Sequence, residues 1–354
     1  MTLRETYSGK RILISGHSGF KGSWLTFMLN HLGAEIFGFS IDTPSNEKHA
    51  YYALEIPKIV NENSIIDGDV SSREYENYID KIKPDFIFHL AAQAIVKHSI
   101  DYPLETFQTN VFGVLRLLEY IRNYSASIVT IVVTSDKCYK NIGTSNPYLE
   151  SDELGGNEPY SASKAAAEIV YHSFLKSYFE EKQLPVATVR AGNVFGGGDW
   201  SENRLIPDCV SQIFENERIF LRMPHATRPW TFVHDILGGY LLLGKALSES
   251  PANYSGSWNF ASGEKRSVLE IAHVLISAFE TFSQSIMLSE TKNSFQEHSQ
   301  LQIDARKARE LLGWRCREDL DTSLAETAKW YLAQHSGEDM RSYSHKFVES
   351  FLAE

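Results

Sequence analysis

Short apolar runs alternate with longer amphipathic segments through the first half of the chain. The runs are rich in Ile, Val and Phe and are almost continuously apolar, which is typical of strands covered on both faces of a parallel sheet. We expect strands at Arg11–Ser15, Glu35–Ser40, Ser64–Asp67, Phe86–Leu90, Ile128–Ser135 and Val186–Arg190. The segments between them predict helices at Ser23–Leu32, Ser72–Ile82, Leu104–Arg122 and Ser161–Glu181. This order predicts an α/β fold of the Rossmann type, with a doubly wound parallel sheet.

The pattern loosens after Arg190, where Gly196–Gly198 and several Pro and Asn residues mark loops. Helical periodicity returns at Arg204–Glu215, Asp235–Leu247, Val268–Phe279 and Leu320–Gln334. A chain of 354 residues exceeds the roughly 250–300 residues at which single cores stop growing. We therefore expect a first domain over 1–190, with returns near 232–260, and a smaller C-terminal substrate-binding domain over 191–354.

The composition excludes several classes of protein. A formal net charge of -11 disfavours nonspecific binding to nucleic acid or to anionic membranes. Cys138, Cys209 and Cys316 are too widely spaced for a zinc site and too few for a disulfide framework, so we expect no metal and a reducing compartment. The N-terminus lacks the apolar core of a signal peptide, and no apolar run approaches the roughly 20 residues that span a bilayer. We expect a cytoplasmic protein.

A glycine motif follows the first predicted strand directly, in the order Gly16-His-Ser-Gly19-Phe-Lys-Gly22. Glycine allows a tight turn and a close backbone approach to a diphosphate, which the N–H groups of the following helix can bind. The position between a strand and a helix favours a dinucleotide site over a plain tight turn. The predicted cofactor contacts in this motif are Gly16, Ser18, Gly19, Phe20, Lys21 and Gly22.

An acidic residue, Asp42, follows the second strand, 20 residues after Gly22. A carboxylate there can accept hydrogen bonds from ribose hydroxyls and repels a 2′-phosphate, which favours NAD over NADP. The alternative is a turn residue before Pro44. Asp69 and Val70 follow the third predicted strand and are candidates for the adenine edge, although Asp is also common in turns.

Tyr160 and Lys164 stand four residues apart at the start of a predicted helix, so they share one face. A free tyrosine titrates near 10, and a nearby ammonium group stabilises its phenolate. Such a pair can remove a proton from a sugar hydroxyl. Tyr-x-x-x-Lys alone is common on helix surfaces. Its place after a nucleotide motif and the segment Thr134-Ser135-Asp136-Lys137 favours catalysis.

These motifs, together with His89-Leu-Ala-Ala-Gln93, resemble the extended short-chain dehydrogenase/reductase family over nearly the whole chain. Within it, Thr134–Tyr139, Arg190–Trp200, Arg204–Asp208 and Ala226–Trp230 are similar to the sugar-nucleotide 4,6-dehydratases, those for CDP-glucose above all. The resemblance implies NAD as cofactor, with Leu90, Ala91, Ala92, Gln93, Tyr160 and Lys164 among its contacts. It also implies a role in deoxysugar biosynthesis, as for lipopolysaccharide O-antigen.

The resemblance implies roles for three consecutive residues. Ser135 would bond the C4 oxygen of the sugar beside Tyr160, and Asp136 would protonate the departing C6 hydroxyl. Lys137 would remove the C5 proton, at a position where relatives acting on dTDP-glucose carry Glu. Lysine can act as a base only if its pKa is depressed. The alternative for Asp136 and Lys137 is a surface turn with an ion pair.

The substrate implied by the resemblance is a nucleotide sugar whose diphosphate needs arginine, because the planar guanidinium donates bidentately. The predicted substrate contacts are Asn193, Arg204, Leu205, Arg228, Trp230 and Asn259. Arg190 and Arg222 are further candidates for the phosphates, and a surface ion pair is the alternative for any one of these arginines. Trp200 is a candidate for closing the pocket.

Three alternatives remain open. His234 and Asp235 depart from the pattern expected after Pro229-Trp230 in the CDP-glucose enzymes. One alternative is therefore a dehydratase for a dTDP-, GDP- or UDP-sugar. A second is a nucleotide-sugar 4-epimerase, and a third is an NAD-binding regulator without catalysis, against which the intact Tyr160, Lys164 and Asp136-Lys137 argue. The resemblance also implies a homodimer or homotetramer through helices 104–122 and 161–181.

Overall fold

A six-stranded sheet forms the centre of the computed structural model, which describes residues 1–124, 127–144, 146–215, 218–279, 286–288 and 301–353. All five strand pairs are parallel, in the order β2-β1-β3-β4-β5-β9. The strands are β1 (Arg11–Ser15), β2 (Glu35–Phe39), β3 (Phe86–His89), β4 (Val129–Val133), β5 (Val186–Ala191) and β9 (Gly256–Phe260). The order reverses between β1 and β3, and doubly wound sheets bind ligands at the carboxyl ends of the strands beside such a point.

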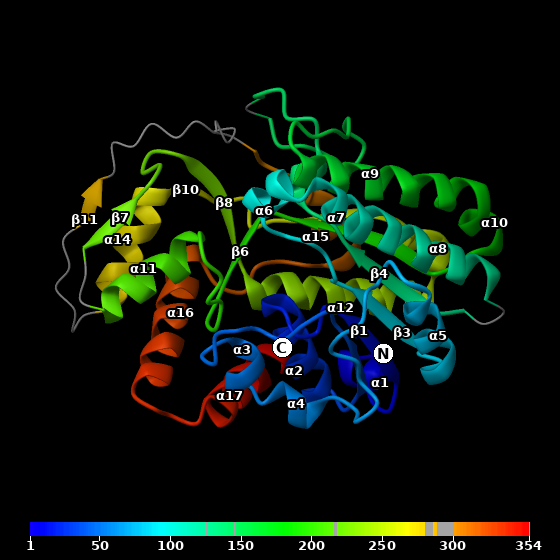
Figure 1. Cartoon of the computed structure of the whole chain (residues 1–354), viewed down its shortest axis with the longest axis horizontal. Coiled ribbons are helices and arrows are strands. Elements are labelled where there is room, and N and C mark those ends of the chain that lie inside the picture. Colours follow the sequence, from blue (N-terminus) through cyan, green and yellow to red (C-terminus); the bar gives the residue numbers. More distant parts are fainter. Residues whose placement is uncertain (125–126, 145, 216–217, 280–285, 289–300, 354) are drawn as a thin grey trace.

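Helices cover both faces of this sheet (Figure 1). Ile12 and Ile14 of β1 join one apolar cluster, whereas Leu13 between them joins a second cluster on the opposite face. The first face is covered by α1 (Leu3–Tyr7), α2 (Phe20–His31) and α12 (Val233–Glu249). The second is covered by α5 (Arg73–Ile82), α8 (Gly113–Asn123) and α9 (Pro159–Phe174). This arrangement confirms the doubly wound α/β fold.

A second group of elements lies at the left of Figure 1. Its strands form two small sheets: β6 (Asn193–Phe195), β8 (Thr227–Phe232) and β10 (Lys265–Ser267) in one, and β7 (Ile219–Leu221) and β11 (Ile286–Leu288) in the other. Its helices are α11 (Leu205–Phe214), α14 (Val268–Ala278) and α16 (Leu320–His335). Val210, Leu275 and Leu324 belong to the same apolar cluster as Ile14, so this group shares a core with the first face of the main sheet.

The remaining helices lie between these elements or follow them in the chain. They are α3 (Ala50–Ala53), α4 (Ile56–Ile59), α6 (Val96–Asp101), α7 (Pro103–Phe107), α10 (Glu180–Lys182), α13 (Pro251–Tyr254), α15 (Arg306–Leu312), α17 (Met340–Leu352), the π-helices η1 (Gln108–Phe112) and η3 (Leu175–Phe179), and the 3-10 helix η2 (Asp136–Cys138). Within the described ranges, no helix is both long enough and apolar enough to cross a membrane.

Three predicted elements differ from the structure, and one of them is the helix expected at Ser161–Glu181, which is divided into α9, η3 and α10. The strand expected at Ser64–Asp67 is a single bridge between Ile65 and Phe39, because Gly68 turns away after its N–H donates to Ser40 O. The helix expected at Leu104–Arg122 is divided into α7, η1 and α8. The π-helix η1 separates the two α-helices, and Asn110 is its buried residue.

Candidate active site

The glycine motif forms a close turn at the carboxyl end of β1. Gly16 has a φ of 75°, and a Cβ there would lie 2.8 Å from the backbone N of Ala91. A Cβ at Gly22 would lie 2.0 Å from Gly16 O. Gly19 is the N-cap of α2 and provides no capping side chain, so the first N–H groups of that helix remain available to an anion. This backbone cradle fits a dinucleotide diphosphate.

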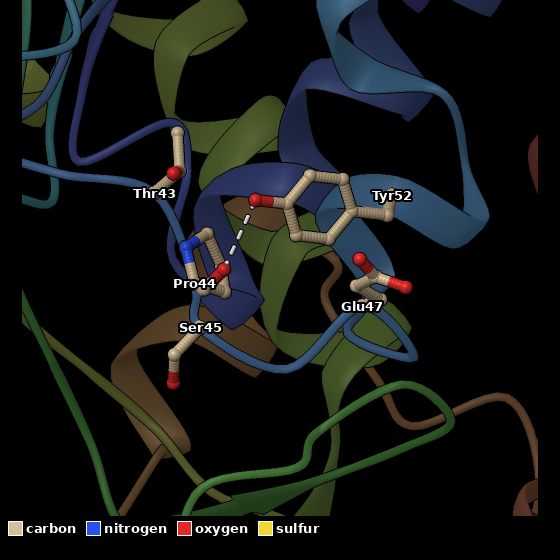
Figure 2. Close-up of a pocket in the computed structure, with 5 residues that line it drawn as sticks. All are labelled: Thr43, Pro44, Ser45, Glu47 and Tyr52. Atoms are coloured by element: carbon tan, nitrogen blue, oxygen red, sulfur yellow. Dashed lines mark hydrogen bonds between the residues drawn. The ribbon is translucent and has the colours of Figure 1, made fainter.

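The end of β2 borders a pocket of about 580 Å³, lined by Thr43, Pro44, Ser45, Glu47 and Tyr52. Figure 2 shows the hydroxyl of Tyr52 pointing to the backbone of Pro44, and this hydroxyl donates to Pro44 O at 3.0 Å. Asp42 is exposed and directly precedes this lining. A carboxylate at the strand end beside an open polar pocket fits the ribose of an adenosine.

The loop after β3 lies against the glycine turn and against α9. Leu90 N donates to Ser15 O at 3.0 Å, and the side chain of Asn110 bonds both the N–H and the carbonyl of Gln93. Asn110 Nδ2 also donates to Ser163 Oγ at 2.9 Å. Asn110 therefore ties the Leu90–Gln93 loop to the helix that carries Tyr160. Sequence reasoning missed Asn110, because only its place in a π-turn identifies it.

Ser135, Asp136 and Lys137 leave the carboxyl end of β4 in one tight turn. Ser135 Oγ donates to Asp136 Oδ1 at 3.0 Å and accepts from Lys137 N at 3.2 Å. Asp136 is 7% exposed and Tyr160 9% exposed. The structure thus brings Ser135, Asp136, Lys137 and Tyr160 together in a largely buried place.

Burial sets the ionisation of the acid and the phenol. It raises the pKa of Asp136, against the opposing charges of Lys137 and Arg228. Burial likewise raises the pKa of Tyr160, and the hydrogen bond with Ser135 and the charge of Lys137 lower it. A raised pKa keeps the Asp136 carboxyl closer to its protonated form, which is the form that an acid catalyst needs.

Two lysines are desolvated in the same place. Burial and the charge of Lys21 lower the pKa of Lys164 to about 7. Burial and the charge of Arg204 lower the pKa of Lys21 to about 8, although Asp136 acts in the opposite direction. Lys164 Nζ donates to Val133 O at 3.3 Å, at the end of β4. Lys21 was predicted from the glycine motif, but its electrostatic link to Asp136 was not.

Two arginines from the C-terminal part of the chain act on Asp136 and Tyr160. Arg204 is the N-cap of α11, bonds Asp199 at 3.1 Å and acts electrostatically on Tyr160. Arg228 lies on β8 and acts on Asp136. A Cβ on Gly192, next to Asn193, would lie 3.2 Å from the Asp136 carboxylate. Leu205 begins α11 directly after Arg204.

Several candidates lie apart from this cluster. Asn259 is fully buried, and its side chain bonds Tyr139, Tyr148 O and Asp304 O. Trp230 is 7% exposed and donates to Arg266 O. Arg222 pairs with Asp208 at 3.1 Å, which is the surface ion pair weighed as its alternative.

Two further candidates are engaged in structural contacts. Arg190 is buried and pairs with Glu168, so it cannot reach a phosphate without breaking that pair. Asp69 accepts from the N–H and the hydroxyl of Ser71, both at 2.8 Å, as a turn residue does. Val70 is buried against Gly113.

The site gathers five cationic side chains, and three of them (Lys21, Lys137 and Arg228) act electrostatically on one buried carboxylate, Asp136. The five are Lys21, Lys137, Lys164, Arg204 and Arg228. In a chain of net charge -11, such a local gathering of positive charge favours an anionic ligand. The arrangement offers an anion cradle, a buried acid and a phenol with a neighbouring lysine at one sheet edge.

Comparison with known proteins decides the family. The family model described as GDP-mannose 4,6 dehydratase matches residues 13–327. The chain belongs to the GDP-mannose 4,6-dehydratase family. The CDP-glucose 4,6-dehydratase of Salmonella typhimurium is 34% identical, over 99% of this chain and 98% of that relative. The family resemblance read from the motifs is confirmed.

Solved structures of similar proteins share the fold of this family member. An epimerase of Methanothermobacter thermautotrophicus superposes with a TM-score of 0.79 at 23% identity, covering 94% of this chain and 95% of its own. The dTDP-glucose 4,6-dehydratase of Bacillus anthracis, solved in complex with NAD, gives a TM-score of 0.77 at 23% identity, covering 95% and 99%. At these identities the similarity shows the fold but does not identify the substrate.

Proposed function

We propose that this family member is an NAD-dependent CDP-D-glucose 4,6-dehydratase, which forms CDP-4-dehydro-6-deoxy-D-glucose. The observation that carries the proposal is the buried turn in which Asp136 and Lys137 lie within electrostatic reach of Tyr160. A dehydration needs both an acid and a base besides the group that serves oxidation. The 34% identity to the Salmonella enzyme supports CDP-glucose as the substrate.

NAD fits the residues of the cradle. The uncapped start of α2 and the close turn at Gly16 suit its diphosphate, and Asp42 suits an unphosphorylated ribose. Bound NAD would supply the redox chemistry, accepting hydride from C4 of the sugar and returning it at C6. Because the cofactor is regenerated in each turnover, the reaction is redox-neutral and is a lyase reaction.

Tyr160 begins the reaction by taking the proton of the C4 hydroxyl. Ser135 orients that oxygen, and its hydrogen bond lowers the pKa of the phenol against the effect of burial. Lys164 lies on the same face of α9 as Tyr160, and its Nζ donates to Val133 O at the end of β4. The residues of α9 and of the turn after β4 therefore serve oxidation together.

Elimination follows from the new C4 ketone, which acidifies the C5 proton. Lys137 removes that proton, and Asp136, whose pKa is raised by burial, gives its proton to the leaving C6 hydroxyl. The C5–H and C6–O bonds break, a C5–C6 double bond forms, and water leaves. Hydride at C6 and a proton at C5 then complete the 6-deoxy sugar.

Arg228 and Arg204 are the residues we assign to the diphosphate of the substrate, with Asn193 and Leu205 beside them. Their guanidinium groups supply the fork geometry that phosphate favours. The product, a 4-keto-6-deoxy sugar nucleotide, would feed deoxysugar biosynthesis such as that of lipopolysaccharide O-antigen. The three free thiols favour a cytoplasmic location.

We assign a homodimer or homotetramer to an apolar face on α7, η1 and α9. Leu104 is 79% exposed, and Phe112 and Ile169 are each 56% exposed. Large apolar side chains gathered on neighbouring helices are typical of protein interfaces. These elements lie side by side on one face of the molecule (Figure 1).

Incubation of the protein and NAD with CDP-, dTDP-, GDP- and UDP-glucose tests the function. We expect a 4-keto-6-deoxy sugar from CDP-glucose, at a kcat/KM at least about 10-fold above the other nucleotides, which is a difference of about 1.4 kcal/mol. A galactose epimer as the product would instead identify an epimerase. Tight NAD binding with no turnover of any nucleotide sugar would identify a binding protein.

A further inference from the structure

One buried ion pair lies behind the catalytic turn and contacts both of its ends. Glu168 Oε2 and Arg190 NH2 are 2.7 Å apart, and the two side chains are 0% and 3% exposed. Glu168 lies on α9 and Arg190 on β5, so the pair joins the helix of Tyr160 to the central sheet. None of the steps assigned above uses either residue.

The start of the turn is bonded to the carboxylate of this pair. Thr134, which directly precedes Ser135, donates its hydroxyl to Glu168 Oε1 and lies 3.2 Å from Val189 O. Thr134 therefore fixes the point at which the chain leaves β4. The position of Ser135, the next residue, depends on how Thr134 is held.

The end of the turn is bonded to the guanidinium of the same pair. Arg190 NH1 donates to the hydroxyl of Tyr139 at 2.6 Å and to Glu150 O at 3.1 Å. Tyr139 directly follows the 3-10 turn and donates in turn to Asn259 Oδ1 at 2.7 Å. The segment with Ser135, Asp136 and Lys137 is thus bonded at both ends to one pair.

The helix that carries Tyr160 also carries one member of this ion pair. Tyr160, Lys164 and Glu168 are spaced by four residues and share one face of α9. The charge of Glu168 also acts on Lys164. The helix that presents the phenol therefore also carries the carboxylate that holds the acid–base turn.

We propose that Glu168 and Arg190 are positioning residues, which hold the Ser135–Lys137 turn in register with Tyr160. This inference rests on the proposed function. A buried ion pair adds little net stability, because desolvation of the two charges offsets their attraction. A displacement of a catalytic group by about 1 Å can nevertheless lower a rate by about 10²-fold. The pair therefore affects the position of the catalytic turn more than the free energy of unfolding.

Thr134→Val tests the proposal, because it removes one hydroxyl bond to Glu168 at the start of the turn. Thr188→Val is the matched control: Thr188 bonds the same carboxylate at 2.9 Å but lies within β5, away from the turn. We expect Thr134→Val to lower kcat by about 10- to 100-fold with KM changed less than about 3-fold. Thr188→Val should change kcat by less than about 3-fold, and Thr134→Ser should restore most of the activity.

Amide hydrogen exchange gives a second readout that needs no turnover. We expect the amides of Ser135–Cys138 to exchange faster in Thr134→Val, and in Tyr139→Phe at the other end, than in Thr188→Val. Equal losses of kcat and equal exchange in the Thr134→Val and Thr188→Val proteins would overturn the proposal and leave a scaffold role. Absence of dehydration in the unmodified protein would count against the proposed function alone, since hydrogen exchange still reports on the turn.

Discussion

At the scale of single residues, Lys137 is the residue whose role depends most on its surroundings. The sequence has Lys137 at the position where the resemblance implies a base. The structure shows which charged side chains lie around the turn that carries Lys137. Lys21, Lys137 and Arg228 act electrostatically on the Asp136 carboxylate. Burial and neighbouring positive charge lower the pKa of Lys21 and of Lys164 in this cluster, which favours the neutral amine of those two residues.

Lys137→Met is expected to separate oxidation from elimination. The variant keeps the length of the side chain and leaves Ser135, Tyr160 and Lys164 in place. Reduced nicotinamide should accumulate after substrate is added, whereas the 6-deoxy product should form about 10²-fold more slowly, the scale of general base catalysis. Absorbance of the cofactor and product analysis measure the two steps. Product formation at the normal rate would assign the base to another residue.

Asp42→Asn is expected to narrow the preference for NAD over NADP. Asp42 is exposed at the end of β2, where its carboxylate would accept from a ribose hydroxyl and repel a 2′-phosphate. Loss of the charge should reduce the NAD/NADP affinity ratio by at least about 10-fold, the scale of one charged hydrogen bond. Equilibrium dialysis measures both affinities, with Glu47→Gln in the neighbouring pocket lining as the control. Equal affinities in the unmodified protein would contradict this assignment.

At the scale of elements, the sequence predicted the parallel strands β1 to β5 within a few residues and placed the main helices, although two of these are divided by π-turns. Their apolar runs and amphipathic periods are local signals. The sequence did not predict the π-turn at Asn110 or the burial of Arg190 behind the turn. Both depend on partners distant in sequence, Gln93 and Glu168. The same limit explains why Asn259 was assigned to the substrate although its amide bonds Tyr139 and two backbone carbonyls.

The apolar face on α7, η1 and α9 is expected to be the subunit interface. Leu104→Glu combined with Phe112→Glu should convert an oligomer into monomers, because a charge buried at an interface lacks a partner. Analytical ultracentrifugation measures the mass. Phe220→Glu is the control, since Phe220 is 54% exposed on β7, away from this face. A monomeric unmodified protein would contradict the assignment.

At the scale of the whole molecule, buried histidines couple stability to pH. Burial lowers the pKa of His17 and His49 to about 4, and the pKa of His89 and His234 to about 3. Within the described part of the chain, neither ring nitrogen of His234 has a hydrogen-bond partner. Below pH 6.5 these histidines bind protons in the unfolded chain, whereas in the folded protein they stay neutral down to about pH 4. The contribution of these histidines to the free energy of unfolding is therefore fully present above pH 6.5 and is lost as the pH falls toward 4.

We expect the free energy of unfolding to fall between pH 7.5 and pH 5.5, by up to about 1.4 kcal/mol per pH unit below 6.5 for each histidine. Asp235 opposes this trend, because burial raises its pKa to about 6. Urea unfolding at the two pH values measures the change, and His234→Leu should reduce it. Unfolding that is independent of pH would show that the rings are protonated or solvated in the folded protein.

The most direct test of the central claim is the fate of the hydrogen at C4 of the sugar. CDP-D-glucose carrying deuterium at C4 is incubated with the protein and NAD in ordinary water, and the product is analysed by NMR. We expect a 4-keto-6-deoxy sugar that carries the deuterium at C6. Recovery of the deuterium at C4, in glucose or galactose, would contradict this expectation.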